Sequence, residues 1–490
     1  MTISELFNNI KIIDTNINLI NSVSKIASDS RKVETNTLFV AIAGEIRDGN
    51  SYINEAIQNG AVAIVTDRTT ECKKTIPYIL VENSREALAK LWSNFYKNPS
   101  KNMKIIAITG TNGKTSTSYF LYNILKADKK SVGLISTIEI LVNNKPIKTS
   151  GGSDVIDKYS AMTTPDPEIL YYLLYIMKKN GVEYVVMEAS SHALAQCKLE
   201  GLDVEIGVFT NLSKEHLDYH KTMEKYFLAK EELFKKSRLC VINIDDEFGI
   251  MMLNRHKGRS FSVSTSKESD FTIKNIKSNA LGVSYTLVSE DESMNISTKV
   301  GGSFNAYNSA LASICALMLG IEQKSIKQGV FSVTSISGRL ERYKNKNIYI
   351  DYAHTPFAVE KVINAVKGFG EKHKIIVLIG CGGNRDKTKR AEIGKICTSR
   401  ADLTIITSDN PRDEEPVDII KDIFAGVVND KCLVIPNRRE AIRYATGIMK
   451  KTDILLLLGK GHERYEIDKT GKHDFDERVI LEEVFSVDKN

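Results

Sequence analysis

The sequence predicts an α/β protein of three domains: a smaller N-terminal α/β domain, a central parallel-sheet domain and a C-terminal, Rossmann-like doubly wound domain. The chain has 490 residues, more than one hydrophobic core usually organises. Short apolar runs alternate with helical patterns, which predicts parallel sheets covered by helices. A polar breaker at 97–101 and a Ser-Gly pair at 337–338 separate three blocks. We therefore expect domains at 1–100, 101–336 and 337–490.

The first block is predicted from three strand-like runs separated by helical patterns. The strands are expected at 38–43, 61–66 and 78–81. The helices are expected near 52–58 and 86–96. This short β–α alternation makes a small α/β domain.

The second block repeats the strand–helix–strand pattern over a longer stretch. Its apolar strands are expected at 105–109, 132–136, 184–188, 206–210 and 239–243. A β-rich stretch with hairpin character follows at 270–300, and a helix at 308–319. Continuous apolar strands indicate a parallel sheet that is buried on both faces.

The third block has strands at 348–351, 375–379, 403–407, 433–435 and 454–458, each followed by a helical segment. Nearly every polar or glycine-rich segment of the second and third blocks comes where a strand ends. Open α/β sheets bind ligands at the carboxyl ends of their strands. We therefore expect these two blocks to face each other across a shared cleft.

Composition narrows the class of protein. The net charge is +6, from 67 basic and 61 acidic residues, which permits an acidic substrate but does not argue for nucleic acid. The seven cysteines include no C-x-x-C pair, so we expect a reduced, cytoplasmic protein without disulfides or a zinc site. No signal peptide is visible at the start, and the longest apolar runs, such as 454–458, are too short to span a membrane.

A phosphate loop is the most informative motif. It follows the strand at 105–109 and opens a helix, so backbone N–H groups form an anion cradle and make this a P-loop ATPase domain. We expect Lys114 to reach the outer phosphates of ATP and Thr115 or Ser116 to hold Mg²⁺. The general pattern has a further glycine where Ile108 stands, so the loop is a shortened variant. The ATP-binding residues are Gly110, Thr111, Asn112, Gly113, Lys114, Thr115 and Ser116.

Three other residues gain meaning only from their context. Glu188 ends an apolar strand and is well placed to hold Mg²⁺, although an isolated strand-end glutamate more often faces solvent. His216 is either a metal ligand or a structural histidine. Lys230 on its own is an ordinary helix lysine.

The order of the motifs along the chain resembles the Mur ligases of peptidoglycan synthesis, and among them the members that add the third residue of the stem peptide. The resemblance runs from Ser28 to Glu463. It rests on GTNGKTS, TTPD, MEASSHAL, FTNLSKEHLDYHKTMEKYFLAK, GSFNAYNSALA, GRLERY, IDYAHTP, GCGGNRDKTKR, DNPR and GKGHE, in that order.

This resemblance implies an ATP-dependent carboxylate–amine ligase that works through an acyl phosphate. The first domain would bind the uridine end of UDP-MurNAc-L-Ala-D-Glu, the second ATP, and the third the incoming amino acid. The small-molecule partners are then UDP-MurNAc-L-Ala-D-Glu, meso-diaminopimelate and ATP, with no nucleic acid and no membrane. We expect a cytoplasmic monomer that serves cell-wall synthesis, cell shape and cell division.

The resemblance also assigns residues. Thr115 and Glu188 would hold one Mg²⁺, and a second would be held by His216 and by Lys230 carrying a CO₂-derived carbamate. Lys114, Glu188, His216 and Lys230 are the catalytic set. Asn308 would bind adenine, and Arg339 and Asp351 the phosphates and ribose. The implied UDP-MurNAc-dipeptide contacts are Ser30, Thr163, Thr164, Ser190, Gln196 and Lys198. The implied diaminopimelate contacts are Arg385, Asp409, Asn410, Pro411, Arg412, Gly459 and Glu463.

Two positions depart from the family pattern, and several alternatives stay open. Lys198 stands where an arginine is usual, and a lysine lacks the bidentate fork. Asn50 replaces a histidine or a similar polar residue. Two arginines and a carboxylate near the Asp409–Arg412 motif suit meso-diaminopimelate, although L-lysine or meso-lanthionine remains possible. Another Mur or folate-type ligase, or a non-catalytic nucleotide-binding module, is the wider alternative.

Overall fold

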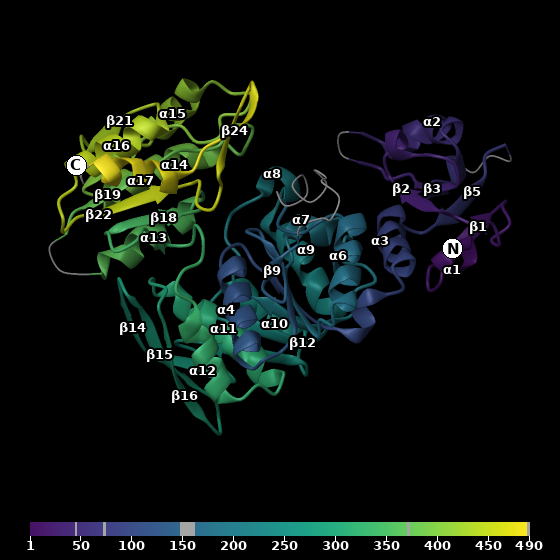
Figure 1. Ribbon diagram of the computed structural model, residues 1–490, viewed down its shortest axis with the longest axis horizontal. Helices are drawn as coiled ribbons and strands as arrows, with labels where there is room; N and C mark the ends of the chain where they lie inside the picture. Colours follow the sequence, from purple (N-terminus) through teal and green to yellow (C-terminus); the bar gives the residue numbers. More distant parts are fainter. Residues whose placement is uncertain (45–46, 72–74, 148–161, 370–372, 488–490) are drawn as a thin grey trace. The chain divides into compact units, whose positions relative to one another are not determined.

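The computed structural model describes residues 1–490 except 45–46, 72–74, 148–161, 370–372 and 488–490 (Figure 1). The predicted fold class is confirmed: three α/β domains carry mixed, largely parallel sheets of five, eleven and six strands, besides a two-stranded hairpin. The chain divides into two compact units. The first comprises Met1–Thr109, Ser131–Gly207 and Ala229–Arg238, and the second Gly110–Lys130, Val208–Leu228 and Leu239–Asn490.

The N-terminal sheet of the first unit has the order β1-β5-β4-β3-β2. Only β1 runs antiparallel, to β5, and the other pairs are parallel. The strands are β1 (Ile12–Thr15), β2 (Lys25–Ala27), β3 (Thr37–Val40), β4 (Ala61–Thr66) and β5 (Tyr78–Val81). Every residue of β3 and β5 is buried, because α2 (Ile53–Gln58) and α3 (Ser84–Phe95) accompany the sheet.

The central strands of the first unit bring one acidic side chain beside the strand that leads to the phosphate loop. Parallel β6 (Lys104–Thr109) and β10 (Tyr184–Glu188) pair in a register that sets Glu188 opposite Ile108. They belong to the eleven-stranded sheet, whose order is β16-β15-β14-β13-β12-β11-β6-β10-β7-β8-β9. The other central strands are β7 (Val132–Ile135), β8 (Ile140–Val142), β9 (Lys145–Pro146), β11 (Val204–Phe209) and β12 (Ser237–Asn243).

In the second unit, three helices pack together: α4 (Lys114–Ala127), α11 (Phe304–Met318) and α12 (Gln323–Ser332). Figure 1 shows them next to a group of strands that ends in antiparallel hairpins. These strands are β13 (Ser260–Ser264), β14 (Phe271–Asn279), β15 (Gly282–Val288) and β16 (Ser293–Thr298). In β16 buried and exposed residues alternate, as expected for a strand with one covered face.

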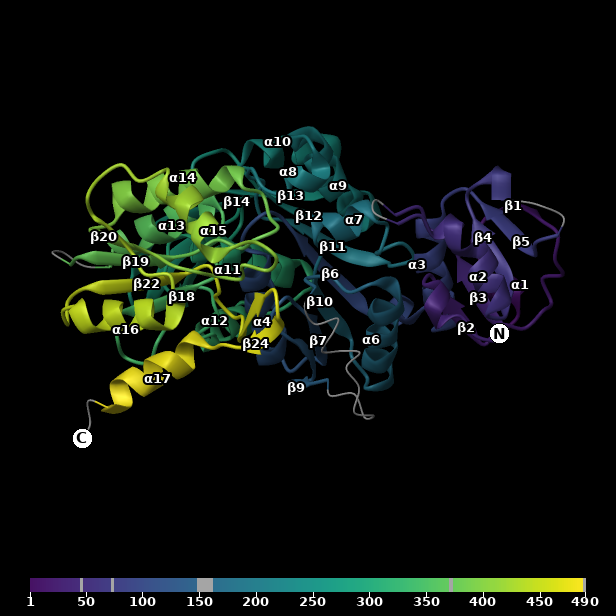
Figure 2. The same cartoon turned by 90° about the horizontal axis from the view of Figure 1, so that it is seen from above.

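The C-terminal sheet is doubly wound, with the order β17-β18-β22-β19-β20-β21. Alternate residues of β19 (Ile375–Ile379) enter two separate cores. One core lies under α13 (Pro356–Lys367), α14 (Thr388–Arg400) and α15 (Pro416–Phe424), and the other under α16 (Arg438–Ile448) and α17 (Glu477–Val487). Figure 2 shows the two helix layers on opposite sides of the strands. The remaining strands are β17 (Glu341–Arg342), β18 (Ile348–Asp351), β20 (Leu403–Ile406), β21 (Cys432–Val434) and β22 (Ile454–Leu458).

Sequence and structure agree best for long apolar runs. The predicted strands at 61–66, 78–81, 184–188, 348–351, 375–379 and 454–458 have the predicted bounds. The prediction did not include β1, whose residues are only partly covered, or the hairpin of β23 (Tyr465–Asp468) and β24 (Gly471–Asp474), which is polar and only partly buried. The helix predicted at 308–319 begins earlier, at Phe304. The predicted linker at 97–101 overlaps the short helix η4 (Pro99–Asn102).

The described part of the chain bears on two expectations, one about the state of the cysteines and one about membrane-spanning helices. Six cysteines are described there and all are free thiols, whereas Cys72 lies outside the described residues. None of the helices within the described ranges combines the length and the apolar character that a membrane crossing needs.

A buried ion pair ties the C-terminal helices to the ends of two strands. Arg438 of α16 donates to Glu477 of α17 at 3.0 Å from Nε and 2.7 Å from Nη2, and both side chains are almost completely buried. Arg438 also donates to the carbonyls of Leu458 (2.8 Å) and Ser408 (3.2 Å), the last residue of β22 and a residue just after β20. Arg438 therefore links the carboxyl end of β22 to the segment that follows β20.

We expect Arg438→Ala to destabilise the protein by about 3–5 kcal/mol, because it leaves the carboxylate of Glu477 buried without its cation. Urea unfolding followed by circular dichroism measures the change. Arg439→Ala is the matched control, since Arg439 is a neighbouring arginine paired with Glu483 at the surface, where such a pair contributes at most about 1 kcal/mol. Equal shifts in the two variants would contradict the assigned role of the buried pair.

Candidate active site

The phosphate loop is clamped by the segment that follows β11. The backbone N–H of Thr111 donates to the carbonyl of Asn211 (2.8 Å), and that of Asn112 donates to Asn211 Oδ1 (3.0 Å). Thr210 Oγ1 donates to the carbonyl of Asn112 (2.6 Å). Because a loop bonded on both its donors and its acceptors has little freedom, the turn keeps its shape without a ligand.

The loop presents cationic and donor groups. Lys114 Nζ donates to the carbonyls of Gly110 and Thr111, both at 2.9 Å, so the ammonium lies over the loop. Gly113 is the N-cap of α4 and has no side chain to satisfy the first N–H groups of the helix. Thr115 and Ser116 are buried in the first turn. A helix start of this kind binds phosphate groups.

Asn308 adjoins the loop through α11. Gly113 has φ +86°, and a Cβ on it would come within 2.4 Å of Asn308 Oδ1. Asn308 Nδ2 donates to Asn305 Oδ1 (2.9 Å), which fixes the side chain. The structure therefore sets Asn308 at the phosphate end of the predicted nucleotide, and its contact with adenine stays a prediction.

Two residues of the C-terminal sheet domain approach the same loop. Arg339 Nη2 donates to Thr115 Oγ1 (3.2 Å), and its guanidinium lies 4.8 Å from the ring centroid of Tyr352. Asp351 accepts from the backbone N–H groups of Leu340 (2.6 Å) and Ala353 (2.7 Å). Burial raises the pKa of Asp351, and the nearby Arg339 opposes that rise. The structure thus brings Arg339 and Asp351 close together, and their contacts with the phosphates and the ribose stay a prediction.

Glu215 is a buried acid to which the sequence analysis assigned no role. Its carboxylate lies 3.2 Å from His354 Nε2 and 3.7 Å from His216 Nε2. Burial alone would raise the pKa of Glu215, but the hydrogen bond from His354 and the charges of His216 and Lys114 lower it well below its usual range. Glu215 therefore connects the predicted metal ligand His216 to β18 and the segment after it. Glu215 directly precedes His216 in the motif FTNLSKEHLDYH, and this neighbourhood is the sequence signal that could have drawn attention to it.

Glu188 is held by Thr137 in the first unit. The carboxylate is buried and accepts from the N–H of Thr137 (2.8 Å) and from its Oγ1 (3.0 Å). Thr137 Oγ1 also lies 3.1 Å from Thr163 Oγ1, which can donate to it. Thr164 Oγ1 donates to the carbonyl of Glu188 (2.9 Å) and accepts from the N–H of Ser190 (2.9 Å). Four predicted residues thus form one group with Thr137, which the sequence analysis missed.

The predicted sugar-peptide contacts continue at the ends of α7 (Ser191–Ala195) and α6 (Pro167–Lys179). Ser190 caps α7, and Gln196 ends it. Lys198 Nζ pairs with Asp166 at 2.7 Å, immediately before α6.

The predicted residue Ser30 lies in the N-terminal sheet domain. Its turn adjoins α6, because Lys32 Nζ is 3.8 Å from Glu168 Oε2. Asn50, which departs from the family pattern, is buried, and its side chain is hydrogen-bonded within the N-terminal sheet domain. It accepts from Thr66 Oγ1 (3.0 Å) and donates to Asp48 Oδ1 (2.9 Å).

His216 and Lys230 differ in environment. His216 has φ +56° and precedes the short helix α8 (Leu217–His220), with its side chain partly exposed. Lys230 lies in α9 (Met223–Lys236) and is 1% exposed. An ammonium buried to this degree is costly, whereas a carboxylate-like carbamate there could hold a cation. The two residues belong to different units, so their pairing stays a prediction.

The third predicted group gathers at the carboxyl ends of β20 and β22. Asn410 Nδ2 donates to Glu463 Oε2 (2.7 Å), and Asn410 Oδ1 accepts from Lys460 Nζ (3.0 Å). Gly459 has φ +106°, and a Cβ on it would lie 2.6 Å from Asp409 Oδ2. Burial, together with the charge of Asp409, raises the pKa of Glu463. Lys460, fully buried, is a further cation that the prediction did not assign.

The two predicted arginines converge on Gly382. A Cβ on that glycine would lie 2.8 Å from Arg412 Nη1 and 3.8 Å from Arg385 Cγ. Arg412 follows Pro411, has φ +53°, and donates from Nη1 to the carbonyls of Gly383 (2.8 Å) and Asn410 (3.3 Å). This group of residues thus brings together the guanidinium of Arg412, the buried ammonium of Lys460 and the carboxylates of Asp409 and Glu463.

Comparison with known proteins identifies the family of this chain. Three family models match in order: "Mur ligase family, catalytic domain" at 22–96, "Mur ligase middle domain" at 108–317, and "Mur ligase, glutamate ligase domain" at 338–461. The chain belongs to the Mur ligase family and is an ATP-dependent ligase that forms an amide bond.

Individual relatives match over nearly the full length. Two are named UDP-N-acetylmuramoyl-L-alanyl-D-glutamate–2,6-diaminopimelate ligase. The one from Caldanaerobacter subterraneus subsp. tengcongensis is 41% identical over 95% of each chain. The one from Clostridioides difficile strain 630 is 39% identical over 99% of this chain and 100% of its own.

Solved structures agree. A structure of a protein with the same name has a TM-score of 0.71 and 27% identity, covering 100% of this chain and 99% of that one. MurF from Acinetobacter baumannii, at 16% identity and a TM-score of 0.63 over 99% of this chain and 98% of its own, shares the fold.

We expect Gly113→Ala to weaken binding of a non-hydrolysable ATP analogue by at least ~10-fold, because the added Cβ would collide with Asn308 and displace the loop. Calorimetric titration measures the affinity. Gly320→Ala is the control: Gly320 has a similar φ of +79° but nothing within 4 Å of its Cβ position, so it carries the backbone strain without the collision. Equal losses of affinity would show that strain alone is responsible.

Proposed function

We propose that this chain joins meso-2,6-diaminopimelate to the γ-carboxylate of D-Glu in UDP-MurNAc-L-Ala-D-Glu, the MurE reaction of peptidoglycan synthesis. The observation that carries the proposal is the full-length similarity to relatives named for this reaction. The pocket around Asp409, Asn410 and Arg412 supports it. We further propose a cytoplasmic monomer with its uridine-, ATP- and amino-acid-binding domains at 1–100, 101–336 and 337–490.

A carboxylate does not react directly with an amine, because its oxide is a poor leaving group, and activation by ATP solves this problem. Transfer of the γ-phosphoryl group of ATP to a carboxylate oxygen gives an acyl phosphate and ADP. The amine then attacks the carbonyl carbon, the resulting tetrahedral oxyanion collapses, and phosphate leaves as the amide forms. Negative charge develops on the phosphoryl oxygens and then on the carbonyl oxygen, so fixed cations and N–H donors supply the catalysis.

In this proposal the loop 110–116 cradles the β- and γ-phosphates, and Lys114 neutralises charge on them. Arg339, already within hydrogen-bond distance of Thr115, contacts the phosphates from the C-terminal sheet domain. Asp351 binds the ribose and Asn308 the base. Lys114 follows β6 and Arg339 precedes β17, which are strands of two different sheets, so ATP binding would join the two domains around the nucleotide.

We propose that Thr115 and Glu188, which belong to different units, each offer an oxygen ligand of the kind that Mg²⁺ prefers. Thr115 contributes a hydroxyl and Glu188 a buried carboxylate oriented by Thr137, and Mg²⁺ is commonly held by one or two side chains together with phosphates and water. Within the described ranges no group of three or more His, Cys, Asp or Glu residues could hold a metal by itself, which suits such a site. The bound ion would stabilise the charge that develops on the transferring phosphoryl group. We assign a second Mg²⁺ to His216 and carbamylated Lys230.

The carbamate leads to a direct test. We expect Lys230→Ala to be nearly inactive, and formate or acetate to restore part of the activity by supplying the missing carboxylate oxygens. Steady-state phosphate release measures both. Lys225→Ala, an exposed lysine on the same helix, should retain full activity without added acid. An inactive Lys230→Ala that no small carboxylate rescues, together with an intact mass for unmodified Lys230 in active enzyme, would exclude the carbamate.

We propose that the substrate dipeptide lies along the group of residues around Glu188. Thr163, Thr164, Ser190, Gln196 and Lys198 would contact the sugar-peptide, and Ser30 the uridine end. Lys198 offers one ammonium rather than a fork, and Asp166 orients it.

Amino-acid selection is proposed to depend on the pocket of β20 and β22. meso-Diaminopimelate bears two carboxylates and two ammonium groups. Arg385 and Arg412 would pair with its carboxylates, while Asp409 and Glu463 would receive ammonium groups. Asn410, Pro411 and Gly459 shape the pocket. L-Lysine lacks the distal carboxylate, whereas meso-lanthionine retains it.

We therefore expect Arg412→Ala to lower kcat/KM for meso-diaminopimelate by roughly 10- to 150-fold, the effect of losing a charge-assisted hydrogen bond worth about 1.5–3 kcal/mol. Turnover with meso-diaminopimelate, meso-lanthionine and L-lysine is measured side by side. Wild-type enzyme should use L-lysine worst, and that slow rate should barely change in Arg412→Ala.

The KM for ATP should stay constant, since Arg412 lies in the amino-acid pocket. Arg400→Ala, a surface arginine paired with Glu360, is the control and should leave all three rates unchanged. An equal loss for all three amino acids would make Arg412 structural and withdraw the assignment of meso-diaminopimelate.

A further inference from the structure

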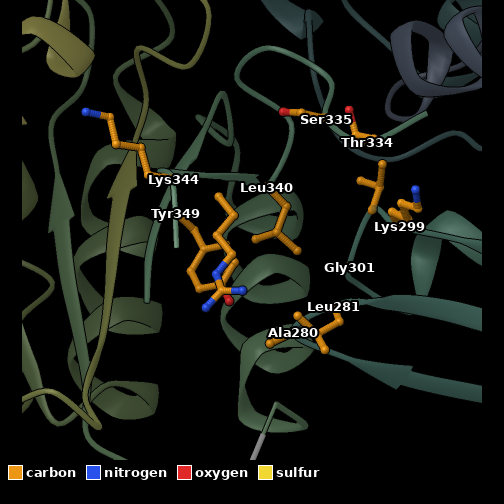
Figure 3. A pocket seen from close by; sticks show the side chains of 11 residues that line it. Ala280, Leu281, Lys299, Gly301, Thr334, Ser335, Leu340, Lys344 and Tyr349 are labelled. Atoms are coloured by element: carbon orange, nitrogen blue, oxygen red, sulfur yellow. The ribbon is translucent and has the colours of Figure 1, made fainter. Parts of the chain in front are cut away.

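A cavity of about 400 Å³ lies in the second unit, apart from the phosphate loop and from the pocket of β20 and β22 (Figure 3). Its walls come from the β14–β15 turn, the segment after β16, the connection after α12 and the first two strands of the C-terminal sheet. Three of the residues that line it are cationic, namely Lys299, Arg342 and Lys344, and no acidic residue of the described chain lines it. The volume is within the range of small-molecule sites.

Tyr349 brings an unpaired polar group into this wall. The residue is 1% exposed, its ring packs in the core of the C-terminal sheet, and within the described part of the chain its hydroxyl has no hydrogen-bond partner. A buried hydroxyl without a partner is rare, because it has lost water and gained nothing in exchange. Burial raises the pKa of Tyr349, so the hydroxyl remains a donor, and Arg342 is close enough to oppose that rise.

Arg342 is pre-positioned and pairs with no carboxylate of the described residues. Its Nε donates to the carbonyl of Lys346 (3.0 Å) and its Nη2 to Asn347 Oδ1 (3.2 Å), both in the turn between β17 and β18. These bonds hold the guanidinium in one place without neutralising it. A fixed and unneutralised guanidinium is the group that proteins use for phosphate and carboxylate.

The other two cations differ. Lys299 Nζ lies 4.3 Å from the ring centroid of Phe331 and makes no ion pair with a described carboxylate. Lys344, in contrast, pairs with Glu482, and Figure 3 shows its amine pointing away from Leu340. Arg342 and Lys299 are therefore the cations available to a ligand.

The rest of the lining is apolar or carries hydroxyl groups. Figure 3 shows Leu340 near the middle of the lining, with Thr334 and Ser335 on one side and Leu281 on the other. Leu281 is 71% exposed at the tip of its hairpin and offers apolar surface beside the cavity. A ligand with an anionic group and an apolar organic part would contact both the cationic and the apolar residues of the lining.

We propose that this cavity is a second ligand site that takes a phosphate group, bound by Arg342, Lys299 and the Tyr349 hydroxyl. The phosphate belongs either to free inorganic phosphate or to a small organic phosphate monoester whose organic part lies against Leu281 and Leu340. The site is separate from the phosphate loop and does not depend on the proposed reaction.

Calorimetric titration of the full-length protein tests the proposal. The phosphate loop is first saturated with Mg²⁺ and a non-hydrolysable ATP analogue, and inorganic phosphate or phenyl phosphate is then titrated. We expect saturable binding of one phosphate group per chain. Phenyl phosphate binding at least ~10-fold tighter would identify an ester as the natural occupant, and equal affinities would identify free phosphate. Absence of saturable binding for both, or displacement of the ATP analogue by them, overturns the site.

Variants identify the location. Arg342→Ala and Lys299→Ala should each raise the Kd by about 10-fold or more, because each removes a charge-assisted contact. Lys277→Ala, which removes an exposed lysine from β14 outside the cavity, should leave the Kd unchanged. If Lys277→Ala weakens binding as much as Arg342→Ala, the binding is non-specific and the proposal fails.

Tyr349→Phe separates a ligand contact from a structural role. It keeps the ring in the core and deletes only the hydroxyl. We expect a higher Kd together with an unchanged or raised Tm of the ligand-free protein, since the variant no longer buries an unpaired hydroxyl. A lower Tm with an unchanged Kd would show that the hydroxyl is structural and does not bind the ligand.

Discussion

The catalytic centre depends on one constraint: the first N–H groups of α4 must stay available in the folded protein and must not move. A side-chain cap would satisfy them and close the anion site, so the N-cap is Gly113. A flexible glycine turn would lose conformational entropy each time it bound a ligand. Asn211 and Thr210 remove that freedom by bonding the loop on both its N–H and C=O groups. The loop is thus rigid where it is held and open where it binds.

The charged groups of the predicted site are each held by fixed polar partners. Lys114 lies over loop carbonyls, Arg339 reaches Thr115, and Glu188 is held by Thr137. Charged groups held by fixed dipoles, in place of mobile water, meet the condition for strong electrostatic stabilisation. The pocket of β20 and β22 repeats the arrangement with Asn410 between Lys460 and Glu463.

The architecture explains why residues so distant in sequence work together. The carboxyl ends of parallel strands lie at one edge of the sheet, and the helices that cover both faces hold the strands in place. Arg438 in the C-terminal domain is an example. Its guanidinium donates to the carbonyls of Leu458, which ends β22, and Ser408, which follows β20, and the buried Glu477 balances its charge. The edges that carry the predicted substrate residues are therefore part of the same core that stabilises the fold.

The sequence by itself determined the class of fold, the phosphate loop and the membership in the Mur ligases, because these depend on local signals. An apolar run such as 375–379 must be a buried strand, and glycines around a lysine after a strand must form an anion loop. Only the tertiary structure decided which polar groups meet. Thr137 beside Glu188, Glu215 between two histidines and the unpaired hydroxyl of Tyr349 are products of long-range packing. No local pattern encodes them, since each depends on the register and packing of segments far apart in the chain.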